Sequence, residues 1–311
     1  MKRVAVIMGG TSSEREISLK SGAAVVKGLT EAGFDVVPMV LNADRIEHLP
    51  EGVETVFLAL HGGYGENGGV QADLDRLGVP YTGPGVAASR IAIDKIASKR
   101  LFEAADVLTA PYEVLPVGVD TLTLSLPVVV KPPRDGSSMG ISKVTDAASL
   151  PAAISAARAL DPFGEVLVEQ YIPGREWTVS VLDQQALPIV EIQAPGGWYG
   201  FKEKYTQGCT QYIFPDEVID APLMAQCQIL ALLAFKAIGG RGVSRVDFRV
   251  TPEGRAYVLE INTIPGFTAI SMYPKLWEAS GVAYPQLIEA LIELALDRKK
   301  QRDRTEREFR S

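Results

Sequence analysis

The sequence is poor in cysteine and histidine, with two of each among 311 residues. Cys209 and Cys227 match no spacing that holds zinc, and two cysteines are too few for a disulfide framework. We therefore expect unpaired thiols in a reducing compartment. Of the two histidines, His48 lies in a segment with no motif, and we expect it on the surface.

Long apolar runs are also missing. No stretch approaches the roughly 20 residues that a membrane-spanning helix requires. The first apolar run, Val4–Met8, ends at Gly9-Gly10 and is too short for the core of a signal peptide, so we interpret it as a β-strand. These observations predict a cytoplasmic protein with no membrane partner.

Positive charge is not in excess, because 31 Lys and Arg stand against 38 Asp and Glu, for a net charge of −7. That balance argues against a broad nucleic-acid surface. The sequence also lacks the Walker A loop, the protein-kinase signature and a G-x-G-x-x-G loop after the first strand. A site for phosphate groups must therefore be built from other residues.

Over residues 1–84, segments with strand character alternate with segments of helical periodicity. Such alternation predicts an α/β domain with a parallel sheet and with ligand sites at the carboxyl ends of its strands. Two of these ends carry unusual loops, Gly9–Glu14 and His61–Gly69. The expected strands are Val4–Met8, Val36–Leu41 and Thr55–Leu60, and the expected helices are Glu16–Ala32 and Val70–Leu77.

Two further segments, 85–173 and 174–311, are expected to mix strands and helices, with a boundary at the Pro173-Gly174 turn. The connection 195–215 is rich in glycine, aromatic residues and lysine, and connections of this length usually serve as functional lids. We expect helices at Val86–Ala105, Ala147–Leu160, Ala221–Ile238 and from Tyr284 onward, and strands at Tyr112–Leu115, Leu126–Lys131, Glu165–Tyr171, Trp177–Leu182, Leu187–Gln193, Gly242–Val250 and Arg255–Asn262.

The last two expected strands carry the most informative chemistry. Side chains alternate between the faces of a strand, so Arg245 and Asp247 share one face. A four-residue turn between the strands is expected to place Arg245 opposite Glu260, and opposed residues also share a face. One face then gathers Arg245, Asp247, Glu260 and Asn262, and the other is expected to be an apolar core set of Val246, Phe248, Tyr257, Leu259 and Ile261.

Two carboxylates, an amide oxygen and a guanidinium on one face suit a magnesium site beside an anion. Glu260 is placed to bridge two metal ions. The alternative is a structural ion pair of Arg245 with Asp247 or Glu260, and the pattern alone leaves both interpretations open. The following loop, Asn262–Gly266, favours the metal site, because it can present the backbone N–H of Gly266 to a developing oxyanion.

A second candidate for phosphate binding is Lys131, which ends an apolar strand and is followed by the glycine- and serine-rich loop Pro132–Gly140. Backbone N–H groups of such a loop can close over phosphates. On its own, the pattern fits an exposed turn with a surface lysine more often. Lys95, in the string Asp94–Lys99, is a weaker candidate, because lysines on helices usually face water.

In this order and spacing, the segments resemble the ATP-grasp superfamily and, within it, the D-alanine–D-alanine ligase family of peptidoglycan synthesis. The resemblance covers the chain from Val4 to about Leu296. It depends on the strings GGTSSEREISL at 9–19, LHGGYGENG at 60–68, DKIASK at 94–99, VVKPPRDGSSMGISKV at 129–144, VEQYIPGREWTV at 168–179, EKYTQGCTQY at 203–212, GVSRVDF at 242–248 and LEINTIPGFT at 259–268.

The resemblance implies a three-domain ATP-grasp fold with an N-terminal parallel sheet, and an ATP site with two Mg²⁺ (or Mn²⁺) ions between the central and C-terminal domains. Lys95 and Lys131 match the family's phosphate-binding lysines, and Ser137 and Ser138 match positions in the lid over the phosphates. The remaining matches are Glu169 for the adenine amino group, Gln170, Tyr171 and Ile172 for the base, Glu176 for the ribose, and Asp247, Glu260 and Asn262 for the metal ions.

The family's reaction passes through an acyl phosphate, which implies a second group of residues that bind and activate two D-alanine molecules. Arg245 and the Gly266 N–H match its oxyanion stabilisers. Glu14, with His61 nearby, matches the anchor of the first substrate's ammonium group. Tyr205, beside Lys204, matches a hydroxyl that links to Ser137 and Glu14, and Ser271 with Met272 matches the site of the second substrate's carboxylate.

Several alternatives remain at this stage. The presence of Tyr205 favours an amide product, but a relative that uses another D-amino acid or D-lactate as second substrate is the main alternative. A nucleotide-binding regulator with a decayed site is less favoured, because every catalytic position holds a competent residue. The resemblance also implies a homodimer, and the charge balance predicts no nucleic-acid partner.

Overall fold

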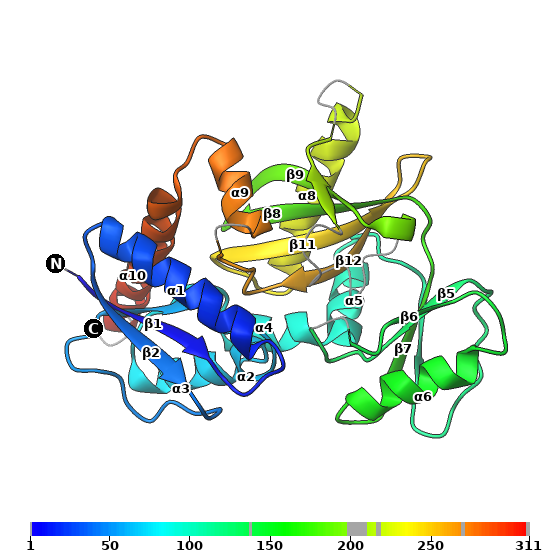
Figure 1. Ribbon diagram of the computed structural model, residues 1–311, viewed down its shortest axis with the longest axis horizontal. Coiled ribbons are helices and arrows are strands. Elements are labelled where there is room, and N and C mark those ends of the chain that lie inside the picture. The colour runs from blue at the N-terminus through cyan, green and yellow to red at the C-terminus, as the bar shows by residue number, and fades with distance from the viewer. Residues whose placement is uncertain (1, 137–138, 198–209, 216–218, 269–270, 309–311) are drawn as a thin grey trace.

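The structure of the chain is a computed structural model that describes residues 2–136, 139–197, 210–215, 219–268 and 271–308. Three sheets organise these residues (Figure 1). A parallel sheet with the two chain ends lies at one side, an antiparallel sheet lies at the other, and a larger antiparallel sheet lies above and between them.

The N-terminal sheet has the order β2-β1-β3, and all its strands run parallel, as the alternation of strands and helices predicted. Residues of β1 alternate between two cores, because Val4 and Val6 pack with one buried cluster and Ala5 and Ile7 pack with another. The strands are β1 (Arg3–Gly9), β2 (Asp35–Leu41) and β3 (Thr55–Leu58), and the helices are α1 (Arg15–Glu31), α2 (Gly63–Glu66) and α3 (Gly69–Leu77).

The last helix, α10 (Tyr284–Glu308), returns to this first sheet and packs against α1 and β3. Leu287 and Ile288 are buried in the same cluster as Val4 and other residues of the sheet. Gly28 of α1 permits the close approach, since a Cβ atom there would lie 2.5 Å from Ile288 Cδ1. The two ends of the chain therefore share one hydrophobic core.

The central sheet is antiparallel, with the order β4-β7-β5-β6. It packs on one helix, whose buried Ile154 and Ala157 face valines of the strands. Its elements are β4 (Tyr112–Leu115), β5 (Val128–Lys131), β6 (Ser142–Val144), α6 (Leu150–Leu160) and β7 (Val166–Gln170).

The third sheet has the order β10-β9-β8-β11-β12 and is antiparallel throughout. Its core contains the buried Trp177 and Phe248 together with Phe235 of a long helix. The elements are β8 (Arg175–Leu182), β9 (Gln185–Gln193), the short helix η1 (Pro195–Gly197), β10 (Gln211–Ile213), α8 (Ala221–Ala237), β11 (Val243–Val250), β12 (Ala256–Asn262) and α9 (Met272–Ala279).

The single helix expected at Val86–Ala105 is wrong, because the structure has two helices there, α4 (Val86–Ile93) and α5 (Lys95–Ala104). Asp94 between them is extended, with φ −88° and ψ 98°, and its carboxylate accepts hydrogen bonds from the N–H groups of Ile96 and Ala97. Asp94 is thus the N-cap of α5. The break places Lys95 at the first position of a helix.

The predicted register of the last hairpin is also wrong by two residues at the site. Arg245 pairs with Asn262, not Glu260, and Asp247 pairs with Glu260. The difference has two parts. Val250 pairs with Ala256 where Arg255 was expected, and a β-bulge at Leu259 adds the second residue, since Asp247 pairs with Glu260 while the next residue, Phe248, pairs with Val258. Together these shifts move Tyr257 and Leu259 out of the expected core set, in which Ala256 and Val258 are buried instead.

Candidate active site

Despite the changed register, the polar face of β11 and β12 forms as predicted. Arg245 donates two hydrogen bonds to Asp247, from Nε to Oδ1 at 2.9 Å and from Nη2 to Oδ2 at 2.8 Å. Thr178 of the neighbouring strand β8 donates to Oδ1 of the same carboxylate at 2.6 Å. Asp247 is therefore held in one orientation on this face.

The second carboxylate of the face, Glu260, meets the lysine that begins α5. Lys95 Nζ lies 3.0 Å from Glu260 Oε2 and donates to the backbone oxygen of Asp135 at 2.7 Å. Burial alone would lower the pKa of Lys95, but the Glu260 carboxylate outweighs burial and the pKa is raised. The buried ammonium group of Lys95 thus connects strand β12 to the glycine- and serine-rich loop Pro132–Gly140.

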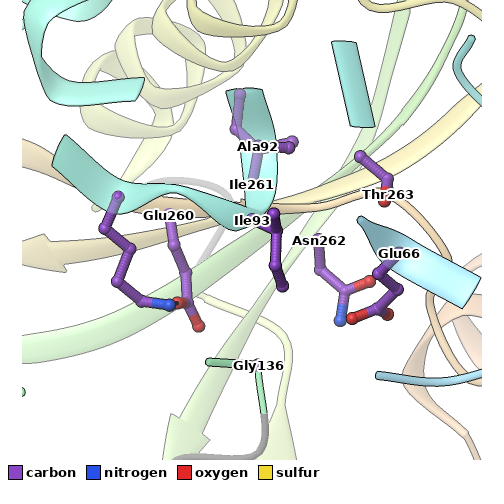
Figure 2. A pocket seen from close by; sticks show the side chains of 9 residues that line it. Glu66, Ala92, Ile93, Gly136, Glu260, Ile261, Asn262 and Thr263 are labelled. Atoms are coloured by element: carbon purple, nitrogen blue, oxygen red, sulfur yellow. Dashed lines mark ion pairs between the residues drawn. The ribbon is translucent and has the colours of Figure 1, made fainter. Parts of the chain in front are cut away.

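A pocket opens beside this ion pair (Figure 2). Glu66 of α2 and Asn262 of β12 point toward one another at one side of it, and Glu260 lies at the other. The pocket thus lies where residues from the parts of the chain that form all three sheets come together: Glu66 follows β3, Gly136 follows β5, and Glu260 belongs to β12. Its lining consists of Glu66, Ala92, Ile93, Lys95, Gly136, Glu260, Ile261, Asn262 and Thr263.

The oxygen donors of the hairpin fit magnesium. Asp247, Glu260 and Asn262 supply two carboxylates and one amide on the same sheet face, and magnesium usually takes one or two carboxylates together with phosphate oxygens. Asn262 Oδ1 accepts a hydrogen bond from the Ile264 N–H at 3.0 Å, which fixes the amide. Among the residues that the structure describes, no group of three or more His, Cys, Asp or Glu side chains is placed to hold a metal ion.

The predicted adenine acceptor, Glu169, is 2% exposed and lies between two lysines. Lys131 Nζ donates to its Oε2 at 2.7 Å, and Lys99 Nζ lies 3.0 Å from its Oε1. Burial alone would raise the pKa of Glu169, but the two ammonium groups outweigh burial and the pKa is lowered. The structure therefore brings the predicted Lys131 and Glu169 into direct contact.

The segment after Glu169 is fixed by Arg249, a buried residue of β11. The backbone oxygen of Ile172 accepts from Arg249 Nε at 3.1 Å, and Glu176 Oε2 lies 3.2 Å from Nη1. Tyr171 OH also contacts this guanidinium, and the Lys143 ammonium lies 3.7 Å from the centre of the Tyr171 ring.

At the start of the same segment, Gln170 Nε2 donates to the backbone oxygens of Ser125 and Pro127, and its backbone N–H donates to the Pro111 carbonyl at 2.8 Å. Gln170 is the last residue of β7, Tyr171 and Ile172 follow it, and Glu176 lies in β8. The four residues matched to the base and the ribose thus form one connected strip.

Glu14 and His61 come from the loops after β1 and β3, which are two neighbouring strands of the parallel sheet. The Glu14 carboxylate lies close to Gly62, the residue after His61, since a Cβ atom on Gly62 would lie 2.7 Å from Glu14 Oε2. His61 Nδ1 donates to the Ile264 carbonyl at 3.1 Å, so its Nε2 is free to accept from Ser21 Oγ at 3.0 Å. Burial lowers the pKa of His61, which favours this neutral form.

The loop after β12 carries the predicted second-substrate residues. Ser271 is the N-cap residue before α9, Met272 begins that helix, and both are half-buried. Gly266 approaches Ser271 so closely that a Cβ atom would lie 2.9 Å from Ser271 Oγ. Since His61 also holds Ile264 in this loop, the positions of Gly266 and Ser271 depend on the N-terminal domain.

Four predicted site residues, Ser137, Ser138, Lys204 and Tyr205, lie outside the described residues. The sequence analysis missed three others that the structure places in the site, namely Glu66, Lys99 and Arg249. Arg249 continues the alternation of Arg245 and Asp247, so the sequence could have predicted that Arg249 lies on the same face of the strand. Glu66 and Lys99 stand inside matched strings, but nothing in the pattern indicated their contacts.

Glu66 is a buried carboxyl group whose protonation depends on its surroundings. Burial, followed by the charge of Glu14, raises the pKa of Glu66 to about 8. In the unfolded chain its pKa returns to an ordinary value, so between about pH 4.5 and 8 the folded chain binds the additional proton. The folded state therefore loses stability as the pH rises through this window.

We expect Glu66→Gln to flatten the dependence of the unfolding free energy on pH between 4.5 and 8. The amide cannot ionise, so the variant lacks a slope of at most about 1.4 kcal/mol per pH unit. Urea unfolding at several pH values measures the difference. The exposed Glu51→Gln serves as the control, and parallel curves for Glu66→Gln and the unchanged chain would contradict the expectation.

Comparisons with known proteins agree with this arrangement. A family model described as D-ala D-ala ligase C-terminus matches residues 104–293, and one described as D-ala D-ala ligase N-terminus matches residues 3–48. The chain is 42% identical over 299 residues to the D-alanine–D-alanine ligase of Geotalea uraniireducens, across 94% of this chain and 96% of the relative. It is 43% identical over 302 residues to that of Syntrophotalea carbinolica, across 96% of this chain and 97% of the relative.

Among solved structures, the D-alanine–D-alanine ligase from Bacillus anthracis complexed with ATP matches with a TM-score of 0.85 and 32% identity, across 97% of this chain and 99% of that one. The fold is that of an ATP-grasp enzyme. The chain belongs to the D-alanine–D-alanine ligase family. In the described part of the chain, no helix is long and apolar enough to cross a membrane.

Proposed function

We propose that this chain joins two D-alanine molecules into D-alanyl-D-alanine at the expense of ATP, for the synthesis of peptidoglycan precursors. The observation that carries the proposal is the convergence of Glu260 and Asn262 of the β11–β12 polar face with Lys95 and Glu66 around one pocket. Glu14 lies against Gly62, in the same loop region as Glu66. Such a site can hold a triphosphate, divalent ions and a small amino acid together.

The chemistry follows from the charges of the site. A carboxylate oxygen of the first D-alanine attacks the γ-phosphorus, ADP leaves, and an acyl phosphate forms. The amino group of the second D-alanine then attacks the acyl carbon, loses a proton and expels phosphate. Positioning and electrostatic stabilisation dominate phosphoryl transfer, and Lys95 and Lys131 supply positive charge for it.

Two magnesium or manganese ions, held by Asp247, Glu260 and Asn262, would neutralise charge on the phosphates when bound. Arg245 and the Gly266 N–H stabilise the oxyanion that forms at the acyl carbon. Glu14 attracts the ammonium group of the first D-alanine, and His61 holds the loop that presents Gly266. Ser271 and Met272 contact the second D-alanine.

The lid residues belong to the same proposal. Tyr205 links to Ser137 and Glu14 when substrates are bound, Lys204 approaches the substrates, and Ser138 covers the phosphates. We further propose three domains at 1–84, 85–173 and 174–311, with the lid loop at 195–215, and a cytoplasmic homodimer.

The proposal is tested by coupled assay of ADP release. We expect release that requires both D-alanine and Mg²⁺, no response to L-alanine, and a product with the mass of D-alanyl-D-alanine. The main alternative is another D-amino acid or D-lactate as second substrate, and a panel of second substrates at limiting D-alanine distinguishes it. ADP release with no dipeptide product would overturn the proposal.

A further inference from the structure

Lys99 is a lysine that the mechanism above does not use, although it is completely buried. Its Nζ donates to Thr109 Oγ1 at 2.6 Å and lies 3.0 Å from Glu169 Oε1. Thr109 Oγ1 in turn donates to the backbone oxygen of Val258, which fixes the acceptor. The ammonium group thus has a defined position beneath the predicted adenine acceptor.

The charges of this cluster do not balance. Two ammonium groups, of Lys99 and Lys131, contact the single carboxylate of Glu169, and all three residues are buried. Burial, only partly offset by Glu169, lowers the pKa of Lys99. An excess of buried positive charge is costly unless an anion approaches. The triphosphate of a bound nucleotide is such an anion, and Lys131 at the end of β5 is the lysine matched to it.

When Lys131 turns toward the phosphates, Glu169 keeps only one cation. Its Oε1, although close to Lys99, accepts no well-directed hydrogen bond from the described residues, so acceptor capacity remains on the carboxylate. Without a cation beside it, a carboxylate in this buried position would bind a proton. The state of Glu169 in the nucleotide complex therefore depends on Lys99.

We propose that Lys99 is a positioning residue that keeps Glu169 ionised and oriented in the nucleotide complex, and that it thereby sets the preference for a 6-aminopurine. The inference rests on the proposed binding of ATP next to Glu169. An ionised carboxylate can only accept hydrogen bonds, so it favours the 6-amino group of adenine and repels the 6-oxo group of hypoxanthine or guanine. A protonated carboxyl can donate to the 6-oxo group and loses this discrimination.

The test compares Lys99→Met with the unchanged chain, using ATP and inosine triphosphate as phosphoryl donors at saturating D-alanine. We expect the ratio of kcat/KM values, ATP over inosine triphosphate, to fall at least about tenfold, since a hydrogen bond to a charged group is lost. Most of the change is expected in the KM for ATP, with the KM for D-alanine unchanged. The exposed Lys236→Met is the matched control.

A ratio within twofold of that of the unchanged chain, in folded Lys99→Met, overturns the inference. If that variant does not fold, Thr109→Val decides the question, because it removes the 2.6 Å acceptor of Lys99 without removing charge. A fall of about threefold in the ratio is expected there, and no change overturns the inference. If the unchanged chain binds neither nucleotide in calorimetry, the proposed function itself fails, which is a different outcome from an unchanged ratio.

Discussion

Arg245→Ala is expected to lower kcat by about 10²–10³-fold, because the loss of one oxyanion donor typically has an effect of this size. The variant also leaves the largely buried Asp247 carboxylate without its guanidinium partner and with the Thr178 hydroxyl as a hydrogen-bond donor, so a loss of stability is expected as well. Steady-state kinetics with D-alanine measures the first effect, and thermal unfolding measures the second. ATP binding is expected to persist in calorimetry.

The control for this variant is Arg255→Ala, which removes an exposed arginine from the turn end of the same hairpin. Arg245→Lys is a second comparison, because it keeps the charge but cannot make both hydrogen bonds to Asp247. Turnover of Arg245→Ala within tenfold of the unchanged chain would argue that the Arg245–Asp247 pair is structural only.

Glu260→Gln is expected to lower kcat by about 100-fold or more, since a metal ligand contributes several kcal/mol to phosphoryl transfer. The amide keeps the shape of the side chain but weakens its attraction for a divalent cation. Saturation with Mg²⁺ should therefore require a higher concentration in the variant. Chelation of the metal by EDTA is expected to abolish turnover of the unchanged chain, and added Mg²⁺ to restore it.

Glu260→Gln also weakens the ion pair with Lys95, so the Mg²⁺ titration is the decisive measurement. A variant that is less stable but has the same Mg²⁺ dependence as the unchanged chain would favour a structural ion pair over a metal site. Glu289→Gln, on the exposed side of α10, is the control.

The period of two along a strand made the polar face of the last hairpin predictable, because Arg245 and Asp247 must share a face wherever the strand pairs. The register was not predictable, because the turn pairs Val250 with Ala256 rather than Arg255, and the bulge at Leu259 depends on how both faces of β12 pack. The grouping of Glu260 with Asn262 survived the error because both lie on the same side of the bulge. Tyr257 lies beyond it, and its predicted face was wrong.

The helix break at Asp94 was not predicted from the sequence for a different reason. An Asp before a helical run is a typical N-cap, but apolar periodicity on both sides of Asp94 favoured one continuous helix. The loop after β5 decided between the two, since Arg134 binds the Asp94 carboxylate and the Pro133 carbonyl accepts from the Lys95 N–H. These contacts join residues about 40 positions apart. The periodicity of neighbouring residues gives no information about contacts over that distance.

The sequence by itself determined the order of most elements, the parallel N-terminal sheet, the family and the polar face of the last hairpin, because periodicity and local motifs are properties of neighbouring positions. Tertiary structure alone decided which charges share a buried space. Glu66 acquires its raised pKa from burial next to Glu14, and Lys99 of α5 acquires a partner in Glu169 of β7. Coulomb energies depend on distance in space and on the exclusion of water, and the spacing of residues along the chain specifies neither.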